Sequence, residues 1–417
     1  MKYSSLLLRS SKKIVRFILD THPWDPSKAR VLLGDYREKE KASGKTNDEH
    51  MLAALEWIKR AQDATGNGGI AGRYLLNKGF TNPYPETSGH IVSTMIKAGY
   101  YFNNEEYWDR AKRIVDFLLS VQMDCGAFQG GEYVKGGKQT PAVFNTGQIM
   151  LGLIAWYGES GAQVVLEVLR RSADWLLSVQ ELDGSWLQYT YGSVKPTNYT
   201  RVAWPLAMTG KILSEKRYIE SASKYFDWFL TKANNETGWV DNMGFYKDDH
   251  DARRSLTHTS AYGYNGALEY GLIFNRTDLI DLVYKASKNI INKFNSSGFI
   301  SAVYDSEGKE KEEYSCLTGN CQLSIIWLKL YKLFKEEIFL KAAEKALDQV
   351  KSYQRLNSLN KGIRGGIAGS RPIWGSYIQY GYPNWAAKYF VDGLLLLEQV
   401  DADTNPEKKD FKFYEKE

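Results

Sequence analysis

The chain has 417 residues, with 54 Lys and Arg against 49 Asp and Glu, which gives a formal net charge of +5. Apolar residues make up 43% and aromatic residues 14%, a composition that excludes a disordered chain, a collagen and a disulfide scaffold. The small net charge and the lack of a Lys/Arg run argue against nucleic-acid binding, and no apolar stretch is long enough to predict a membrane span.

The first 20 residues contain scattered basic residues and an apolar run, Leu6 to Leu8, that is too short for the core of a signal peptide. This segment predicts an amphipathic helix that packs on the body of the protein. Cys125, Cys316 and Cys321 are odd in number and have no repeated spacing, as expected of free thiols. We therefore expect a cytoplasmic protein.

One segment type recurs along the chain: an amphipathic helix followed by a turn that contains glycine. The turn glycines are Gly69, Gly126, Gly184, Gly238, Gly298 and Gly365, at spacings of 57, 58, 54, 60 and 67 residues. A second helix type alternates with the first and begins at residues that are good N-caps. These residues are Thr87, Thr146, Thr200, Thr259, Thr318 and Asn384. The second type is apolar on most sides and is expected to be buried, whereas the first has a charged face and is expected to lie outside.

Twelve alternating helices predict an all-α (α/α)6 toroid over residues 46–400, with a helical extension at 1–45 and a charged tail at 401–417. An open solenoid is the alternative, but its repeats are shorter, about 34 to 47 residues. Long loops lead from each outer helix to the next inner helix, and we expect the functional site on their face. These loops are rich in Gly and poor in Lys, which favours a flat, hydroxyl-rich ligand such as a sugar.

The N-terminus of each inner helix directs free N–H groups and the positive end of its dipole toward this face. Glu86 and Asp241 are the predicted carboxyl pair of a hydrolase, and Asp241, in a Gly-Trp-x-Asp turn beside Trp239, is a candidate general acid. His258 and Tyr262 lie four residues apart on one helix face and are the predicted acid–base pair of a lyase or epimerase. A structural role, in capping or in the core, is the alternative for each of these groups.

The predicted substrate-binding residues lie at the starts of inner helices or in the loops that lead to them. They are His90, Asn145, Gln148, Tyr199, Arg201, Trp239, Asn320, Arg371, Trp374, Asn384 and Trp385. Arg201 or Arg371 would hold a uronate carboxylate in a lyase or epimerase. The acidic run from Asp248 to Asp251 is interpreted as a solvated loop. No metal or other cofactor is expected, because the cysteines lack zinc-site spacing.

The six-hairpin pattern resembles the α/α-toroid superfamilies: six-hairpin glycosidases, polysaccharide lyases, sugar epimerases, terpene cyclases, prenyltransferase β subunits and lanthionine cyclases. The motifs typical of the last three, Asp-x-Asp-Asp, Asp-x-Cys and Cys-His-Gly, are absent. Segments 85–90 (PETSGH) and 317–322 (LTGNCQ) resemble the P-E-T-T-G-Y and L-T-G-N-A-Q segments of VpsJ-like toroid proteins from polysaccharide gene clusters. His90 and Cys321 depart from those patterns.

The resemblance implies a carbohydrate-active enzyme that acts on an oligo- or polysaccharide in surface-polysaccharide metabolism. Within this class, a glycoside hydrolase is expected ahead of a lyase or an epimerase. A polysaccharide-binding toroid without catalytic activity is one alternative. An isoprenoid or peptide cyclase or transferase on the same fold is another. The sequence predicts no oligomeric state.

Overall fold

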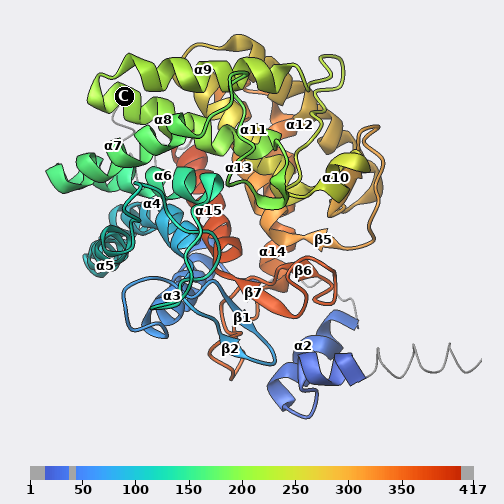
Figure 1. Ribbon diagram of the computed structural model, residues 1–417. Helices are drawn as coiled ribbons and strands as arrows, with labels where there is room; N and C mark the ends of the chain where they lie inside the picture. Colours follow the sequence, from blue (N-terminus) through green and yellow to red (C-terminus); the bar gives the residue numbers. More distant parts are fainter. Residues whose placement is uncertain (1–14, 37–43, 405–417) are drawn as a thin grey trace, which may run out of the picture.

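The computed structural model describes residues 15–36 and 44–404, and these form the predicted helical toroid (Figure 1). The outer helices are α3 (Asn47–Asp63), α5 (Glu106–Ser120), α7 (Gln163–Ser178), α9 (Lys216–Leu230), α12 (Thr277–Ser297) and α14 (Glu337–Tyr353). The inner helices are α4 (Pro85–Phe102), α6 (Val143–Ser160), α8 (Thr200–Leu213), α11 (Thr257–Ile273), α13 (Leu317–Phe334) and α15 (Asn384–Thr404). Within these described ranges, no helix is long and apolar enough to cross a membrane.

The inner helices form a closed ring. Contacts run from α4 to α6, α8, α11, α13 and α15 in turn, and α15 packs back against α4. The last inner helix also packs against the first outer helix, α3, so the two ends of the repeat array meet. This closure confirms the (α/α)6 toroid and excludes the open solenoid.

The two helix types differ in burial as their sequences predict. In the outer helix α9, Tyr218, Tyr225, Phe226 and Phe229 are buried on one face. In the inner helix α13, the residues from Leu317 to Ser324 are all buried. The apolar faces of the outer helices and most sides of the inner helices are therefore buried, and burial of their large apolar side chains stabilises the fold.

A recurring glutamine at or just after the end of an outer helix joins neighbouring repeats. Its side-chain amide donates to the carbonyl of a turn glycine or its neighbour and to a carbonyl of the next outer helix. The pairs are Gln62 with Gly68 and Arg110, Gln122 with Gly126 and Val168, Gln180 with Gly184 and Ser221, and Gln354 with Gly365 and His50. The last pair crosses the closure between the final and first repeats.

The small polar residues near the inner-helix starts are not the N-caps that the sequence predicts. Ser88 and Thr146 donate to the carbonyls of Tyr84 and Ala142, 2.8 and 2.9 Å away, within their own first turns. The same hydroxyl oxygens accept the N–H groups of the preceding loop, from Ile70 at 2.9 Å and Phe128 at 3.0 Å. They therefore fix the first and second long loops to the helices that follow them.

Short strands also connect the long loops. Strands β1 (Arg73–Leu75), β2 (Gly79–Phe80) and β7 (Gly381–Pro383) form an antiparallel sheet that joins the first and last loops. Two further pairs, β3 (Arg254–Leu256) with β4 (Val303–Asp305) and β5 (Ser315–Cys316) with β6 (Ser370–Arg371), join loops of adjacent repeats. Two short 3-10 helices, η1 (Tyr191–Ser193) and η2 (Thr197–Tyr199), and α10 (Lys247–Asp251) complete this face. The sequence analysis did not predict these elements.

The N-terminal extension is tied to the body through α2 (Pro26–Tyr36). Asp35 pairs with Arg355 at 2.6 Å and accepts the backbone N–H of Ile373 at 2.8 Å. Residues 15–21 are helical, and the Phe17 ring contacts Tyr380. The predicted helix over the first 20 residues and the predicted tail at 401–417 lie partly outside the described residues.

Replacing Gly365 with alanine tests how the ring closes. Gly365 has a φ of 82°, and a Cβ there would overlap the backbone carbonyl of Ala53 in α3. Gly298 is the matched control, because its φ is 81° but nothing lies within 4 Å of a Cβ at that position. We expect Gly298→Ala to lower the free energy of unfolding by about 1 kcal/mol and Gly365→Ala by at least about 3 kcal/mol, measured by urea unfolding. Equal losses in the two variants would contradict this account of the closure.

Candidate active site

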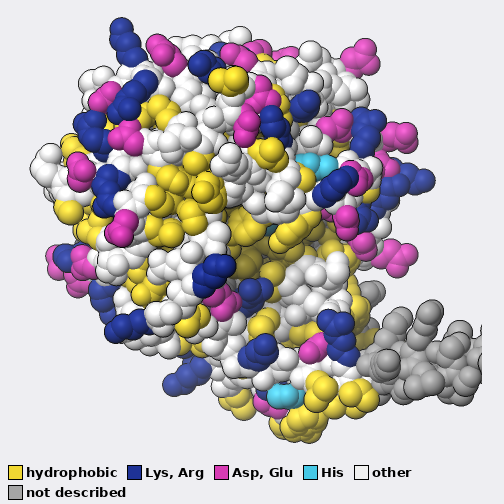
Figure 2. Space-filling view, in the orientation of Figure 1, with side chains coloured by type: hydrophobic (Ala, Val, Ile, Leu, Met, Phe, Trp, Pro, Cys, Tyr) yellow, Lys and Arg dark blue, Asp and Glu magenta, His cyan; other side chains and the backbone are white. Residues whose placement is uncertain are grey.

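A cavity of about 370 Å³ opens on the long-loop face, where the first turns of four inner helices meet the loops. Figure 2 shows this face hollowed near its centre, with hydrophobic side chains lining the recess. The wall is mainly aromatic, from Tyr84, Phe144, Tyr191, Phe245, Tyr246, Tyr262, Tyr377 and Trp385. Its ionisable groups other than tyrosine are Arg73, Glu86, Glu132, Asp249 and His258. Four predicted residues thus meet here: Glu86, His258, Tyr262 and Trp385.

Glu86 is the most strongly perturbed carboxyl group of this cavity. It lies in the first turn of α4, is 5% exposed, and its Oε1 has no hydrogen-bond partner among the described residues. Burial raises the pKa of Glu86 to about 8, although the nearby charges of Arg201 and Lys388 act to lower it. Glu86 is therefore mostly protonated at neutral pH and is able to donate a proton.

His258 lies in the first turn of α11 and is held in one orientation. Its Nδ1 is 2.8 Å from Oε1 of Gln322, and because a carbonyl oxygen only accepts, Nδ1 carries the hydrogen. This leaves Nε2 as the ring's basic atom. The ring also contacts those of Tyr262 and Tyr377, with centroids 4.4 and 5.4 Å apart. Burial lowers the pKa of His258 to about 4, so the imidazole is neutral at neutral pH.

Tyrosine hydroxyl groups connect the aromatic wall to the helices. The Tyr191 hydroxyl donates to Oδ1 of Asn145 at 2.8 Å and lies 3.3 Å from the Tyr84 hydroxyl. The Trp385 ring contacts that of Tyr84, with centroids 6.3 Å apart, and Nε1 of Trp385 donates to the Tyr377 hydroxyl at 2.7 Å. Rings oriented in this way offer flat apolar faces and polar edges to a ligand.

Two acidic residues of the cavity were not predicted. Glu132 pairs with Arg73 at 3.3 Å, and Asp249 pairs with Arg254 at 3.6 Å. Burial is the main cause of a raised pKa for Asp249. Asp249 belongs to the acidic run that the sequence analysis interpreted as a solvated loop. Glu132 follows two glycines in the second loop and carries no periodic or motif signal that could have identified it.

Asp241 does not line this cavity, so the structure does not place it with Glu86 as predicted. Its carboxylate accepts Nε1 of Trp239 at 3.0 Å and pairs with Arg253 at 3.1 Å. Trp239 lines a separate cavity of about 150 Å³. The Asp241 carboxylate is thus held within its own Gly-Trp-x-Asp turn, because it accepts a hydrogen bond from the indole N–H two residues earlier.

Five predicted binding residues are buried beneath the cavity and do not line it. They are His90, Gln148, Tyr199, Arg201 and Asn320. Asn145 is also buried, but it reaches the wall through Tyr191. His90 lies directly below Glu86, with Nε2 3.5 Å from Oε1 of Glu86.

The remaining predicted residues hold the sixth loop in place. Asn384 donates to the Ala71 carbonyl at 3.0 Å and to the Thr87 hydroxyl at 2.9 Å. The guanidinium of Arg371, in β6, lies over the ring of Tyr353, and the Trp374 carbonyl accepts the Gln379 side chain. None of these three residues lines the cavity of about 370 Å³, which we call the aromatic cavity. In the described part of the chain, no group of three or more His, Cys, Asp or Glu side chains could hold a metal ion.

Residues 80–260 match the family described as Beta-L-arabinofuranosidase, GH127 catalytic domain. The matched segment is less than half of the chain, and it contains Glu86 and His258. No curated protein sequence matches the chain. The family match agrees with the predicted class of carbohydrate-active enzymes.

The whole toroid is similar to solved enzyme structures. An unsaturated glucuronyl hydrolase specific for heparin has a TM-score of 0.67 at 15% identity, over 88% of this chain and 99% of that chain. The unsaturated glucuronyl hydrolase of Bacillus sp. GL1 has a TM-score of 0.66 at 14% identity, over 85% and 97%. Cellobiose 2-epimerase from Bacillus thermoamylovorans has a TM-score of 0.65 at 14% identity, over 83% and 97%. At these identities the similarity establishes a shared fold.

Replacing Glu86 with glutamine tests its protonation state in the folded protein. A carboxyl in the unfolded chain ionises near its usual pKa of about 4.5, whereas folded Glu86 ionises near 8. The folded state retains a proton between these values, so this contribution to stability is complete below pH 4.5 and is lost as pH rises through 8. We expect the melting temperature of Glu86→Gln minus that of the wild type to increase from pH 5 to pH 9.

Glu106→Gln is the control for this measurement. A hydrogen bond from Lys59 is the main cause of a lowered pKa for Glu106, so its charged form stabilises the fold. The difference for Glu106→Gln should become more unfavourable as the pH rises through the acidic range to about 4.5, and should stay nearly constant from pH 5 to pH 9. A pH-independent difference for Glu86→Gln would contradict the protonated carboxyl.

Proposed function

We propose that the protein is a carbohydrate-active enzyme that binds its sugar substrate in the aromatic cavity, with Glu86 as the general acid. The observation that carries this proposal is a buried carboxyl group, protonated at neutral pH, at the floor of a cavity walled by aromatic rings. Aromatic rings stack on the apolar faces of sugars. A volume of about 370 Å³ falls within the range of small-molecule sites.

In this proposal His258 is the base that complements Glu86. Its Nδ1 hydrogen is held by Gln322, and the neutral ring accepts a proton through Nε2. In hydrolysis, Glu86 protonates the leaving glycosidic oxygen while His258 takes a proton from the attacking water. In epimerisation or elimination, His258 takes a proton from a sugar carbon and Glu86 returns one to carbon or to the leaving oxygen. We place hydrolysis first because the family match is to a glycosidase.

The substrate class follows from the proteins that the chain resembles, and three kinds of compound test it. These are β-L-arabinofuranosides, unsaturated glucuronyl disaccharides and cellobiose. New reducing ends indicate hydrolysis, and new ultraviolet absorbance from a saturated substrate indicates elimination. New NMR signals from a sugar inverted at one carbon indicate epimerisation. A role in surface-polysaccharide metabolism is part of the proposal and rests on the resemblance of segments 85–90 and 317–322. Binding without turnover of any oligosaccharide would favour the non-catalytic alternative.

The pH dependence of kcat/KM follows from the two perturbed groups. Activity needs Glu86 protonated and His258 neutral, so we expect a bell-shaped profile with limbs near pH 4 and pH 8. Glu86→Gln should lower kcat by about 10²–10⁴-fold, the usual contribution of a general acid. A profile that is flat from pH 6 to pH 10 would refute Glu86 as the acid.

Substitution of His258 and of the acidic residues of the cavity identifies the group that acts together with Glu86. We expect His258→Ala to lower kcat by at least about 100-fold, and Glu132→Gln and Asp249→Asn by less than about tenfold. Asp241→Asn is the control outside the cavity and should leave kcat nearly unchanged. If Glu132→Gln or Asp249→Asn abolishes hydrolysis while His258→Ala retains it, the enzyme instead uses two carboxyl groups.

A further inference from the structure

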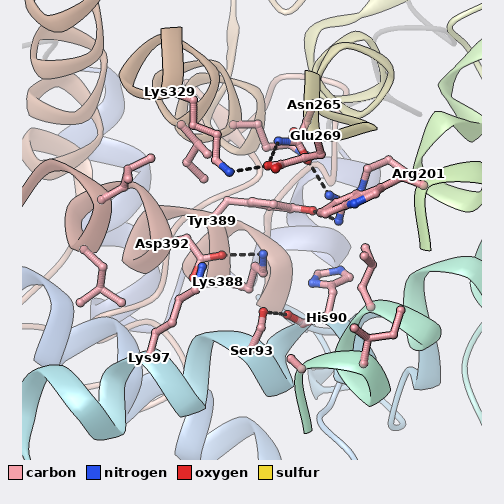
Figure 3. A pocket seen from close by; sticks show the side chains of 18 of the residues that line it. His90, Ser93, Lys97, Arg201, Asn265, Glu269, Lys329, Lys388, Tyr389 and Asp392 are labelled. Atoms are coloured by element: carbon pink, nitrogen blue, oxygen red, sulfur yellow. Dashed lines mark hydrogen bonds and ion pairs between the residues drawn. The ribbon is translucent and has the colours of Figure 1, made fainter. Parts of the chain in front are cut away.

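A second cavity, of about 270 Å³, lies inside the ring of inner helices and is shown in Figure 3. It is lined by side chains from all six inner helices, and His90, at its boundary, contacts Glu86 of the aromatic cavity. We call it the lumen cavity. Part of its lining is apolar, from Leu151, Ile154, Ala155, Met208, Ile325 and Leu396. Charged side chains form another part of the lining.

Arg201 is a buried cation of the lumen cavity that lacks a carboxylate partner. It is 4% exposed, and its guanidinium donates to Gln148, Asn265 and Tyr389, all of which are neutral acceptors. No ion pair within 4.0 Å joins it to an acidic residue of the described chain. A buried charge is costly unless it is paired, so this position favours a negative charge supplied from outside the chain.

The other charged groups of the lumen cavity do not cancel that of Arg201. Lys388 pairs with Asp392 and Lys329 pairs with Glu269, each at 2.6 Å, as Figure 3 shows. Lys97 also lines the cavity, so four cationic and two acidic side chains surround it. The C-terminal dipoles of the inner helices oppose an anion, but their effect fades within the last turn. The side chains therefore leave an excess of two positive charges.

His90 provides a separate indication of a missing ligand. It is 1% exposed and lines the lumen cavity, and neither ring nitrogen has a hydrogen-bond partner in the part of the chain that the structure describes. Burial, and then the charge of Lys388, keep the pKa of His90 well below its usual value, so the ring is neutral. A neutral imidazole offers one donor and one acceptor. Buried polar groups are normally hydrogen-bonded, so these atoms require a ligand or water.

We propose that the lumen cavity binds a small organic anion, a carboxylate or a phosphate ester, whose charge pairs with Arg201. One or two negative charges on the ligand would match the excess positive charge of the side chains that line the cavity. The apolar residues of the lining then contact the non-polar part of the ligand. This site does not depend on what the aromatic cavity binds.

Occupancy of the lumen cavity is expected to affect Glu86. The charges of Arg201 and Lys388 act to lower the pKa of Glu86, and a bound anion would offset both. The alkaline limb of the activity profile should then move to higher pH. This consequence rests on the proposed function, whereas anion binding itself does not.

Isothermal titration calorimetry of the full chain at low ionic strength, with inorganic phosphate and with benzoate, tests the site. We expect one saturable site for at least one probe, weakened by added salt. Phosphate alone binding assigns a phosphate ester, and benzoate alone a carboxylate. Arg201→Gln should weaken binding by at least about tenfold, and Lys97→Gln by several-fold. Lys112→Gln, on the exposed face of α5, makes the same change in net charge and should bind as the wild type does.

The remaining outcomes also decide whether the lumen cavity binds an anion. If Arg201→Gln does not fold, Met208→Glu places a negative charge on the cavity wall and should abolish binding. Lack of saturable binding of both probes overturns the proposal, and so does an equal loss in Lys112→Gln, which would indicate general attraction to a basic chain. Glu86→Gln should retain anion binding while turnover is lost, so failure of this proposal and failure of the proposed function are distinguishable.

Discussion

Closure of the ring is the constraint on which the rest of the structure depends. At the junction of the last and first repeats, the Gln354 amide donates to the carbonyls of Gly365 and His50. Gly365 has no side chain, so its backbone lies against α3, and β7 adds to β1 beside it. The hydrogen bonds of Gln354 match those that the Gln122 and Gln180 side-chain amides donate to the next outer helix between internal repeats. The last repeat therefore forms with the first repeat the same kind of hydrogen bonds that join internal neighbours.

A closed ring places two cavities on one axis. The N-terminal turns of the inner helices meet at the aromatic cavity, where backbone N–H groups and long loops are available to a ligand. The lower turns of the same helices enclose the lumen cavity. Glu86 and His90 are one helical turn apart on α4 and 3.5 Å apart, and the 2.8 Å hydrogen bond between His258 and Gln322 is a second contact between residues of the two cavities. Chemistry in one cavity is therefore within electrostatic reach of the other.

Burial has different consequences for the ionisable groups of this axis. Glu86 becomes neutral by keeping its proton, and His258 becomes neutral by losing one. An arginine side chain stays charged in proteins, and Arg201 is stabilised by amide and phenol oxygens and by the rings of Trp204 and Tyr262, without a carboxylate. In the two proposals, the same desolvation equips Glu86 and His258 for proton transfer and favours an anion beside Arg201. This shared cause is why the acid–base pair and the lumen cavity belong to one electrostatic system.

The sequence by itself determined the architecture and the face of the site. The turn glycines, the alternation of amphipathic and apolar helices and the unequal loops are local or periodic features, and each predicts structure without knowledge of distant contacts. Glu86 and His258 were predicted from such features, and both line the aromatic cavity, because the first turns of the inner helices converge in a closed toroid.

Which residues share a cavity was decided only by tertiary structure. Asp241 was excluded by its contacts with Trp239 and Arg253, and Asp249 and Glu132 were brought in by loops that have no periodic pattern. Arg201, predicted to hold a substrate carboxylate, lies instead in the lumen cavity. Helix register repeats along a sequence, but the paths of long loops and the depth of a side chain depend on packing between segments that are far apart in the chain.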